Sequence, residues 1–160
     1  MKKEKGGCLK MIENKQNLSS FNTRYEVSLR LLLLLSEATI WPLSSLEIAD
    51  IDFMTIYGKE FGVSDINLNG DNKFKFGQLK DRKKLIEESL KKLVRLGWVY
   101  VNTKNGFKYM INDHGTEYIS KMDDTYSRQY RQTVKSIFKK YDVRNLSVIK
   151  EAEKKSGENK

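Results

Sequence analysis

The 160-residue chain has few of the residues on which catalytic, metal-binding and cross-linked sites usually depend. It contains one cysteine, one histidine and one proline. With Cys8 as its single cysteine it has neither an internal disulfide nor a cysteine-based zinc site, and we expect a reducing compartment, the cytoplasm. It also lacks GxxxxGK[ST], HExxH and CxxC motifs. We therefore predict a protein that is not an enzyme and that uses no metal or other cofactor.

Long hydrophobic runs are absent as well. The longest apolar run covers residues 31–35, whereas a membrane-spanning helix needs about 20 such residues. The charged N-terminus is followed by no apolar stretch, so we expect no signal peptide and no membrane contact.

Positive charge, in contrast, is plentiful and unevenly placed. The net charge is +9, and residues 80–95 alone hold seven basic and three acidic residues. Residues 21–79 are net acidic, so the excess lies in the two ends and in this one segment. Such a distribution suits a polyanion or an acidic protein as partner, although it could also serve solubility alone.

The remaining pattern predicts helices followed by a hairpin. Apolar spacing and capping residues predict helices over residues 23–38, 45–57 and 79–96, the first buried on all sides with a Glu26–Arg30 pair on its polar edge. Strands at 98–103 and 107–111 flank Lys104-Asn105-Gly106, for which we expect a type I′ turn. The fold class is α+β and mostly helical: a winged helix-turn-helix with a two-stranded wing and a C-terminal helical extension.

Four segments follow from this pattern. We expect a disordered basic tail at residues 1–20, a winged-helix domain at 21–112, a helical extension at 113–143 and a weakly ordered charged tail at 144–160.

The third helix and the hairpin carry the candidate nucleic-acid contacts. The predicted DNA-binding residues are Lys80, Arg82, Lys83, Lys84, Lys104 and Lys108. Only Gln78 and Arg82 could read base edges, so we expect backbone contacts that are salt-sensitive and independent of sequence. A solvated basic face with Glu87–Lys91 and Glu88–Lys92 pairs is an equally good interpretation.

Aromatic and apolar residues after position 112 carry the candidate protein interface. These residues are Tyr118, Tyr126, Tyr130, Ile137, Phe138 and Tyr141. They are too many for a solvated tail, so we expect them to dock on the core or on a partner.

The order of these features resembles the type 2 middle component of bacterial ABC-three-component systems, which overlap with the Lamassu class of anti-phage and anti-plasmid defence. The residues that carry the resemblance are Phe21, Asn22, Thr23, Glu26, Arg30, Pro42, Asp52, Phe53, Tyr57, Phe61, Asn67, Leu68, Asn69, Gly70, Leu90, Leu93, Val94, Gly97, Gly106, Phe107, Tyr109, Gly115, Tyr118, Tyr126 and Tyr130. One departure is Asn69, where the family pattern leads us to expect histidine, so no special role is transferred to that loop.

The resemblance implies a bridging subunit in a hetero-oligomer. Middle components of this kind join an SMC-like ATPase to an effector, often a nuclease, and the chemistry belongs to those partners. On this view the basic segments help to hold DNA, and the aromatic C-terminal helix is an interface. Two alternatives stay open: a winged-helix DNA-binding transcription regulator, and an adaptor with no DNA role.

Overall fold

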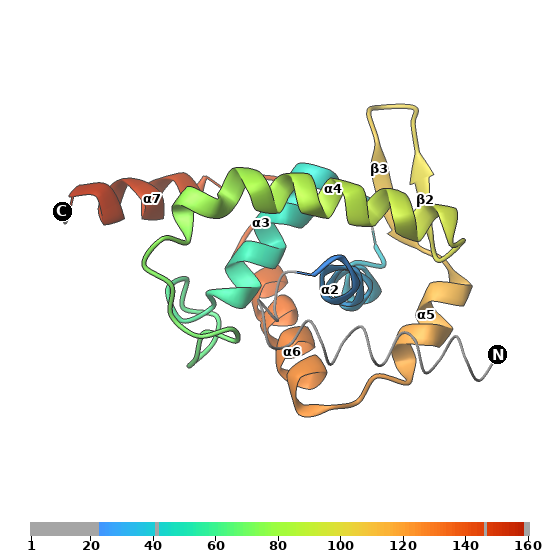
Figure 1. The fold of residues 1–160 in the computed structure, drawn as a ribbon, viewed down its shortest axis with the longest axis horizontal. Coiled ribbons are helices and arrows are strands. Elements are labelled where there is room, and N and C mark those ends of the chain that lie inside the picture. Colours follow the sequence, from blue (N-terminus) through green and yellow to red (C-terminus); the bar gives the residue numbers. More distant parts are fainter. Residues whose placement is uncertain (1–22, 41, 146, 159–160) are drawn as a thin grey trace.

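The computed structural model describes residues 23–40, 42–145 and 147–158, so the predicted tail at 1–20 lies outside the described residues. The described chain is mostly helical with a small antiparallel sheet (Figure 1). Its helices are α2 (Arg24–Glu37), α3 (Ser45–Ile56), the 3-10 turn η1 (Phe76–Gln78), α4 (Leu79–Arg95), α5 (Asp113–Ser120), α6 (Thr125–Lys140) and α7 (Val148–Glu158). Its strands are β1 (Leu43–Ser44), β2 (Val99–Asn102) and β3 (Lys108–Ile111).

Helix α2 is the centre of the fold. Thr23 caps it by accepting a hydrogen bond from the backbone N–H of Glu26, and residues 31–35 are at most 1 % exposed. In Figure 1 the helix is seen almost end-on, and it packs against α4, α6, α5 and α3. The burial predicted from the leucine run is confirmed. The predicted Glu26–Arg30 surface pair is wrong, because Arg30 is 3 % exposed and turns inward to Asp52.

Helix α3 begins with a complete capping box. The Ser44 hydroxyl accepts from the backbone N–H of Glu47, and the Glu47 carboxylate accepts from the backbone N–H of Ser44 at 2.9 Å. Ser44 also ends the two-residue strand β1, so one residue joins the strand to the helix. In the first turn of α3 Leu46 is 57 % exposed, whereas Ile48 is fully buried.

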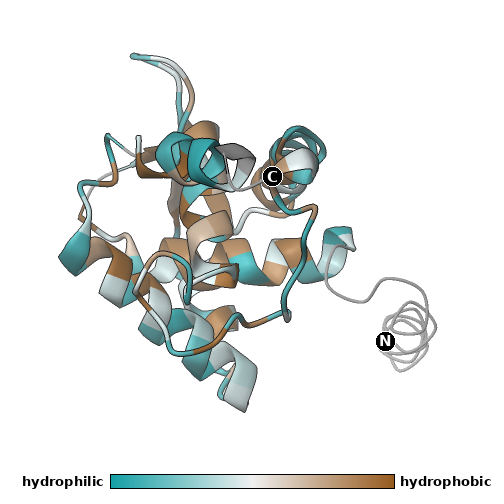
Figure 2. Cartoon of the chain, turned by 90° about the vertical axis from the view of Figure 1, so that its left-hand side faces the viewer, coloured by the Kyte–Doolittle hydropathy of each residue, from teal (hydrophilic) through white to brown (hydrophobic). Residues whose placement is uncertain are grey.

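The sheet has three strands in the order β1-β3-β2, all antiparallel. Strand β1 pairs Leu43 with Tyr109, which ties the start of α3 to the hairpin; two residues are too few to show an alternating pattern in the sequence. The strands of the β2–β3 hairpin contact α4 and α2, and the tip of the hairpin projects beyond the helices (Figures 1 and 2).

The predicted type I′ turn in this hairpin is wrong. The last strand pair is Asn102 with Lys108, so the connecting loop spans residues 103–107 instead of the expected 104–106. No non-glycine residue of the described chain has a positive φ, whereas Gly106 has φ +79°. A longer loop needs the left-handed conformation at only one position, and glycine supplies it.

The C-terminal helices close the core from the other side. Helix α6 packs on α2 and α3, with Tyr130, Val134 and Ile137 fully buried. Residues 148–158, expected to be weakly ordered, form α7. Its Ile149 is 5 % exposed and belongs to the core cluster, so the start of α7 packs on the rest of the fold. The weak order of residues 144–160 stays a prediction.

Candidate functional site

A buried ionic cluster around Asp52 connects four helices. The Asp52 carboxylate accepts hydrogen bonds from Arg30 of α2 at 3.0 and 3.2 Å and from Arg82 of α4 at 3.3 Å. The Tyr130 hydroxyl of α6 donates to the same carboxylate at 2.7 Å. Asp52 itself lies on α3 and is 1 % exposed. One side chain therefore holds α2, α3, α4 and α6 together.

The electrostatics of the cluster keep Asp52 ionised. Burial by itself would raise the pKa of Asp52, but the attraction of Arg30 and Arg82 and the hydrogen bonds of Arg30 and Tyr130 lower it below its usual value. Burial, together with the negative charge of Asp52, raises the pKa of Tyr130 well above its usual value, so that the phenol stays a hydrogen-bond donor. A cluster enclosed in this way is suited to holding helices in place.

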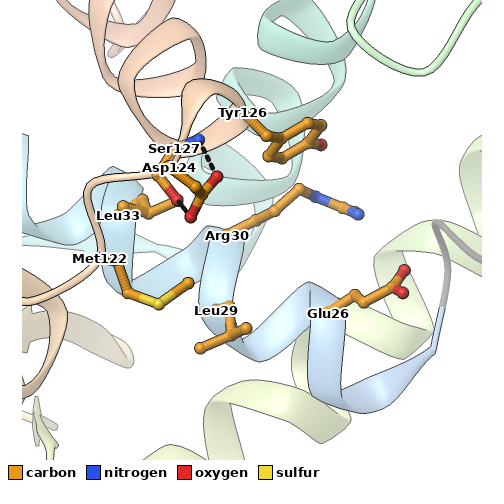
Figure 3. Close-up of a pocket in the computed structure, with 8 residues that line it drawn as sticks. All are labelled: Glu26, Leu29, Arg30, Leu33, Met122, Asp124, Tyr126 and Ser127. Atoms are coloured by element: carbon orange, nitrogen blue, oxygen red, sulfur yellow. Dashed lines mark hydrogen bonds between the residues drawn. The ribbon is translucent and has the colours of Figure 1, made fainter. Parts of the chain in front are cut away.

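An open, largely apolar pocket lies beside this cluster. It has a volume of about 280 Å³ and lies between α2 and the start of α6 (Figure 3). It is lined by Glu26, Leu29, Arg30, Leu33, Met122, Asp124, Tyr126 and Ser127. The Asp124 carboxylate faces Ser127 and caps α6, and the Tyr126 hydroxyl donates to Asn69 at 2.9 Å. These polar groups are occupied with structural hydrogen bonds.

The structure separates the predicted DNA-binding residues into two groups. Lys80, Lys84 and Lys104 are exposed, Lys83 is half-buried, and Lys108 pairs with Glu47 at 3.2 Å. Arg82 is only 8 % exposed and its guanidinium is bound to Asp52. Its prediction as a phosphate contact needs correction, because a side chain that closes the core cannot also reach a ligand.

Four of the five exposed cations of α4, two before and two after the exposed Glu87, form what we call the basic stripe: Lys80, Lys84, Lys91 and Arg95. Their spacing places them on one face, opposite the buried Ile86 and Leu93, over a length of about 22 Å. The expected Glu87–Lys91 and Glu88–Lys92 ion pairs do not occur among the residues that the structure describes. Glu88 instead pairs with Arg24 of α2 at 3.0 Å. The i,i+4 rule therefore failed for Lys91, a cation of the stripe that the sequence had paired with Glu87.

The predicted partner residues mostly dock on the core, one of the two expected outcomes. Tyr130 and Ile137 are fully buried and offer no surface to a partner, so their prediction as interface residues is corrected. Tyr118 stacks on Trp98 with ring centroids 4.3 Å apart, and the Tyr141 hydroxyl donates to the Phe61 carbonyl at 2.8 Å.

The other four predicted partner residues, Tyr118, Tyr126, Phe138 and Tyr141, are partly exposed, and three of them line pockets. Tyr126 lines the pocket described above, and half-buried Phe138 lines a second pocket together with Ile40, which is 81 % exposed.

Neither a metal site nor a membrane span is found in the described parts of the chain. No three His, Cys, Asp or Glu side chains come together there as ligands. None of the described helices has the length and apolar character needed to cross a bilayer.

The sequence model of one family, ABC-three component (ABC-3C) system Middle Component 2, matches residues 20–159. The chain belongs to this family. The match covers every described element from α2 to α7, so the resemblance drawn from the sequence is confirmed. As a middle component of a multi-component system, the protein works with protein partners. No curated protein and no solved structure matches the chain.

Proposed function

We propose that this middle component is a non-catalytic bridging subunit that joins an SMC-like ATPase to a nuclease-type effector in a bacterial anti-phage or anti-plasmid defence complex. The observation that carries the proposal is the family match over residues 20–159. The structure adds support in that the strongest polar cluster, around Asp52, is closed and holds helices together. The surfaces proposed to contact partners are the basic stripe, the hairpin and the rims of the pockets.

The arrangement of residues 24–111 supports a winged-helix assignment. Helix α2, strand β1, helices α3 and α4 and the β2–β3 hairpin follow one another in the order that a winged helix-turn-helix has. In this assignment α4 is the third helix, the hairpin is the wing, and β1 is the short strand that pairs with the wing. Helices α5 to α7 form the C-terminal extension.

DNA contact through the N-terminal half of the basic stripe and the tip of the hairpin is part of the proposal. Lys80 and Lys84 lie in the N-terminal half of α4, which enters the groove in winged-helix complexes, and Lys104 lies at the tip of the hairpin. With Arg82 committed to Asp52, few side chains remain that read base edges. Contacts to the DNA phosphates hold DNA without selecting a sequence, which suits a subunit that helps to hold DNA near an SMC-like ATPase.

The bridging role is tested by co-expressing the chain with the products of the adjacent genes and measuring size-exclusion profiles with and without DNA. We expect one stable complex that contains a large coiled-coil ATPase. A lone chain in every fraction would contradict the bridging role. A homodimer that protects one discrete promoter sequence would make the protein a transcription regulator instead.

Charge reversal at the proposed DNA contacts, Lys80, Lys84 and Lys104, should weaken DNA binding by a defined amount. In the Lys80→Glu/Lys84→Glu/Lys104→Glu variant we expect at least about a tenfold lower affinity for a 30-bp duplex, and a plot of log affinity against log salt that is shallower by about three units. The matched control is Lys59→Glu/Lys121→Glu/Lys139→Glu, which makes the same change in net charge at exposed positions away from α4 and the hairpin. Equal losses in both variants would show that only net charge matters.

A further inference from the structure

A groove distinct from the two pockets described above lies between the C-terminal half of α4 and the hairpin. Its volume is about 410 Å³. Helix α4 contributes Lys91, Val94 and Arg95 to it, and the hairpin contributes Val101, Phe107 and Tyr109. In Figure 1 the hairpin rises beside this end of α4. The strand register explains the lining, because Val101 is paired with Tyr109 and both side chains lie on the same face of the hairpin.

The floor of the groove is apolar and partly uncovered. Tyr109 is 8 % exposed and Val94 is half-buried, but Phe107 at the rim is 65 % exposed. An exposed phenylalanine beside a concave apolar floor is a feature of protein-binding sites, since a partner side chain can cover both at once. A DNA backbone would gain nothing from these carbon atoms.

The charge around the groove indicates the nature of the partner. Lys91 and Arg95 are exposed, lie one turn apart, and have no ion-pair partner within the described chain. The exposed Glu87 lies one turn before Lys91, and its charge adds to the effect of burial in raising the pKa of Tyr109. The groove thus presents two free cations beside an apolar floor, and a complementary ligand carries carboxylates beside apolar side chains.

We propose that this groove binds an acidic segment with apolar anchor residues from one of the partner proteins of the complex. The proposal rests on the bridging function above and assigns to it a surface and a partner chemistry. It divides α4 between two tasks: Lys80 and Lys84 at the N-terminal end face DNA, and Lys91 and Arg95 at the C-terminal end hold the partner segment.

The first test places a photo-crosslinking benzoylphenylalanine at Phe107 in the full chain, co-expressed with the products of the adjacent genes. Position Tyr100 is the control, since it is 48 % exposed on the same hairpin but does not line the groove. We expect a crosslink from position 107, and none from position 100, to a partner peptide that is rich in Asp or Glu around apolar residues. A complex that forms but yields a crosslink from position 107 to DNA, to a second copy of this chain or to nothing overturns the groove assignment and leaves the bridging role intact. Failure of the complex to form overturns both.

A second test uses two matched surface variants, so that folding is not at issue. Lys91→Glu/Arg95→Glu should weaken retention of the partner protein by at least about tenfold, whereas Lys80→Glu/Lys84→Glu should leave retention unchanged and reduce DNA binding. All four side chains are exposed, and each variant changes the net charge equally. Equal losses of partner binding in the two variants, or no loss in either, would overturn the proposal.

Discussion

Replacing Asp52 with alanine is expected to lower the free energy of unfolding by about 3–5 kcal/mol, a large part of the ~5–15 kcal/mol typical of a domain. The carboxylate holds Arg30 and Arg82, which are at most 8 % exposed, and accepts from the buried hydroxyl of Tyr130. Without it, two guanidinium groups stay in the core without their shared anion. Thermal and urea unfolding, followed by circular dichroism, measure the loss.

Asp50→Asn is the matched control, two residues earlier on the same helix. Burial raises the pKa of Asp50 in the folded protein, an effect that Lys83 and Lys150 oppose. Ionising this carboxylate therefore destabilises the folded state as the pH rises above the ordinary pKa of an aspartate. The asparagine variant should therefore be as stable as the parent at neutral pH, or more so. A comparable loss in Asp50→Asn and Asp52→Ala would contradict the role given to the cluster.

The pH dependence of the Asp52 effect follows from the sign of its pKa shift. The folded-state pKa is lowered, so the stabilisation is complete above the unfolded value of about 3.9 and is lost as the pH falls through the folded value. The difference between the parent and Asp52→Ala should hence shrink only in strong acid.

Replacing Gly115 with alanine is expected to cost about 1–3 kcal/mol, although alanine favours helix by about 1 kcal/mol. A Cβ at Gly115 would be driven into the backbone carbonyl oxygen of Trp98 and would lie 2.8 Å from Cγ1 of Ile111. The Trp98 carbonyl oxygen accepts a hydrogen bond from the backbone N–H of Asn112 at 3.1 Å, so moving this carbonyl away from the new methyl group would disturb that bond. The melting temperature should fall by several degrees, at about 2–4 °C per kcal/mol.

A glycine with free space provides the control for this substitution. At Gly77 a Cβ would meet no atom within 4 Å and the backbone is in an ordinary conformation, so Gly77→Ala should be neutral or stabilising by up to about 1 kcal/mol. Unchanged stability in Gly115→Ala would show that α5 does not pack this closely on Trp98. Loss of near-ultraviolet dichroism from the stacked Trp98 and Tyr118 would support the packing.

Local signals in the sequence predicted the helices well and the strands less well. The cap at Ser44 is complete, and the bounds of α2 and α4 lie within a residue of those expected, because capping and apolar spacing act over a few residues. Strand β1 was missed because a two-residue strand exists only through its pairing with β3, a partner more than 60 residues away. The turn type was wrong because the strand register, not the turn residues alone, set the loop length.

For the candidate sites too, the sequence predicted residue types but not which of those residues are buried. The sequence identified the cations of α4, but charge alone did not distinguish Arg82, which is bound to Asp52, from exposed Lys84. Likewise it identified the aromatic residues of α6 without showing that Tyr130 lies in the core and donates to Asp52. The groove beside Phe107 could not be predicted, because its two walls come from α4 and the hairpin and meet only in the folded chain.

The sequence by itself determined the mostly helical class, the buried central helix, the order of elements and the family, since these depend on composition, periodicity and the order of motifs. Only the tertiary structure decided which polar residues are surface and which are core. Whether Arg30, Arg82 and Tyr130 are buried depends on how four helices pack around Asp52. A buried carboxylate is stable only with the cations and hydrogen-bond donors that this packing brings to it.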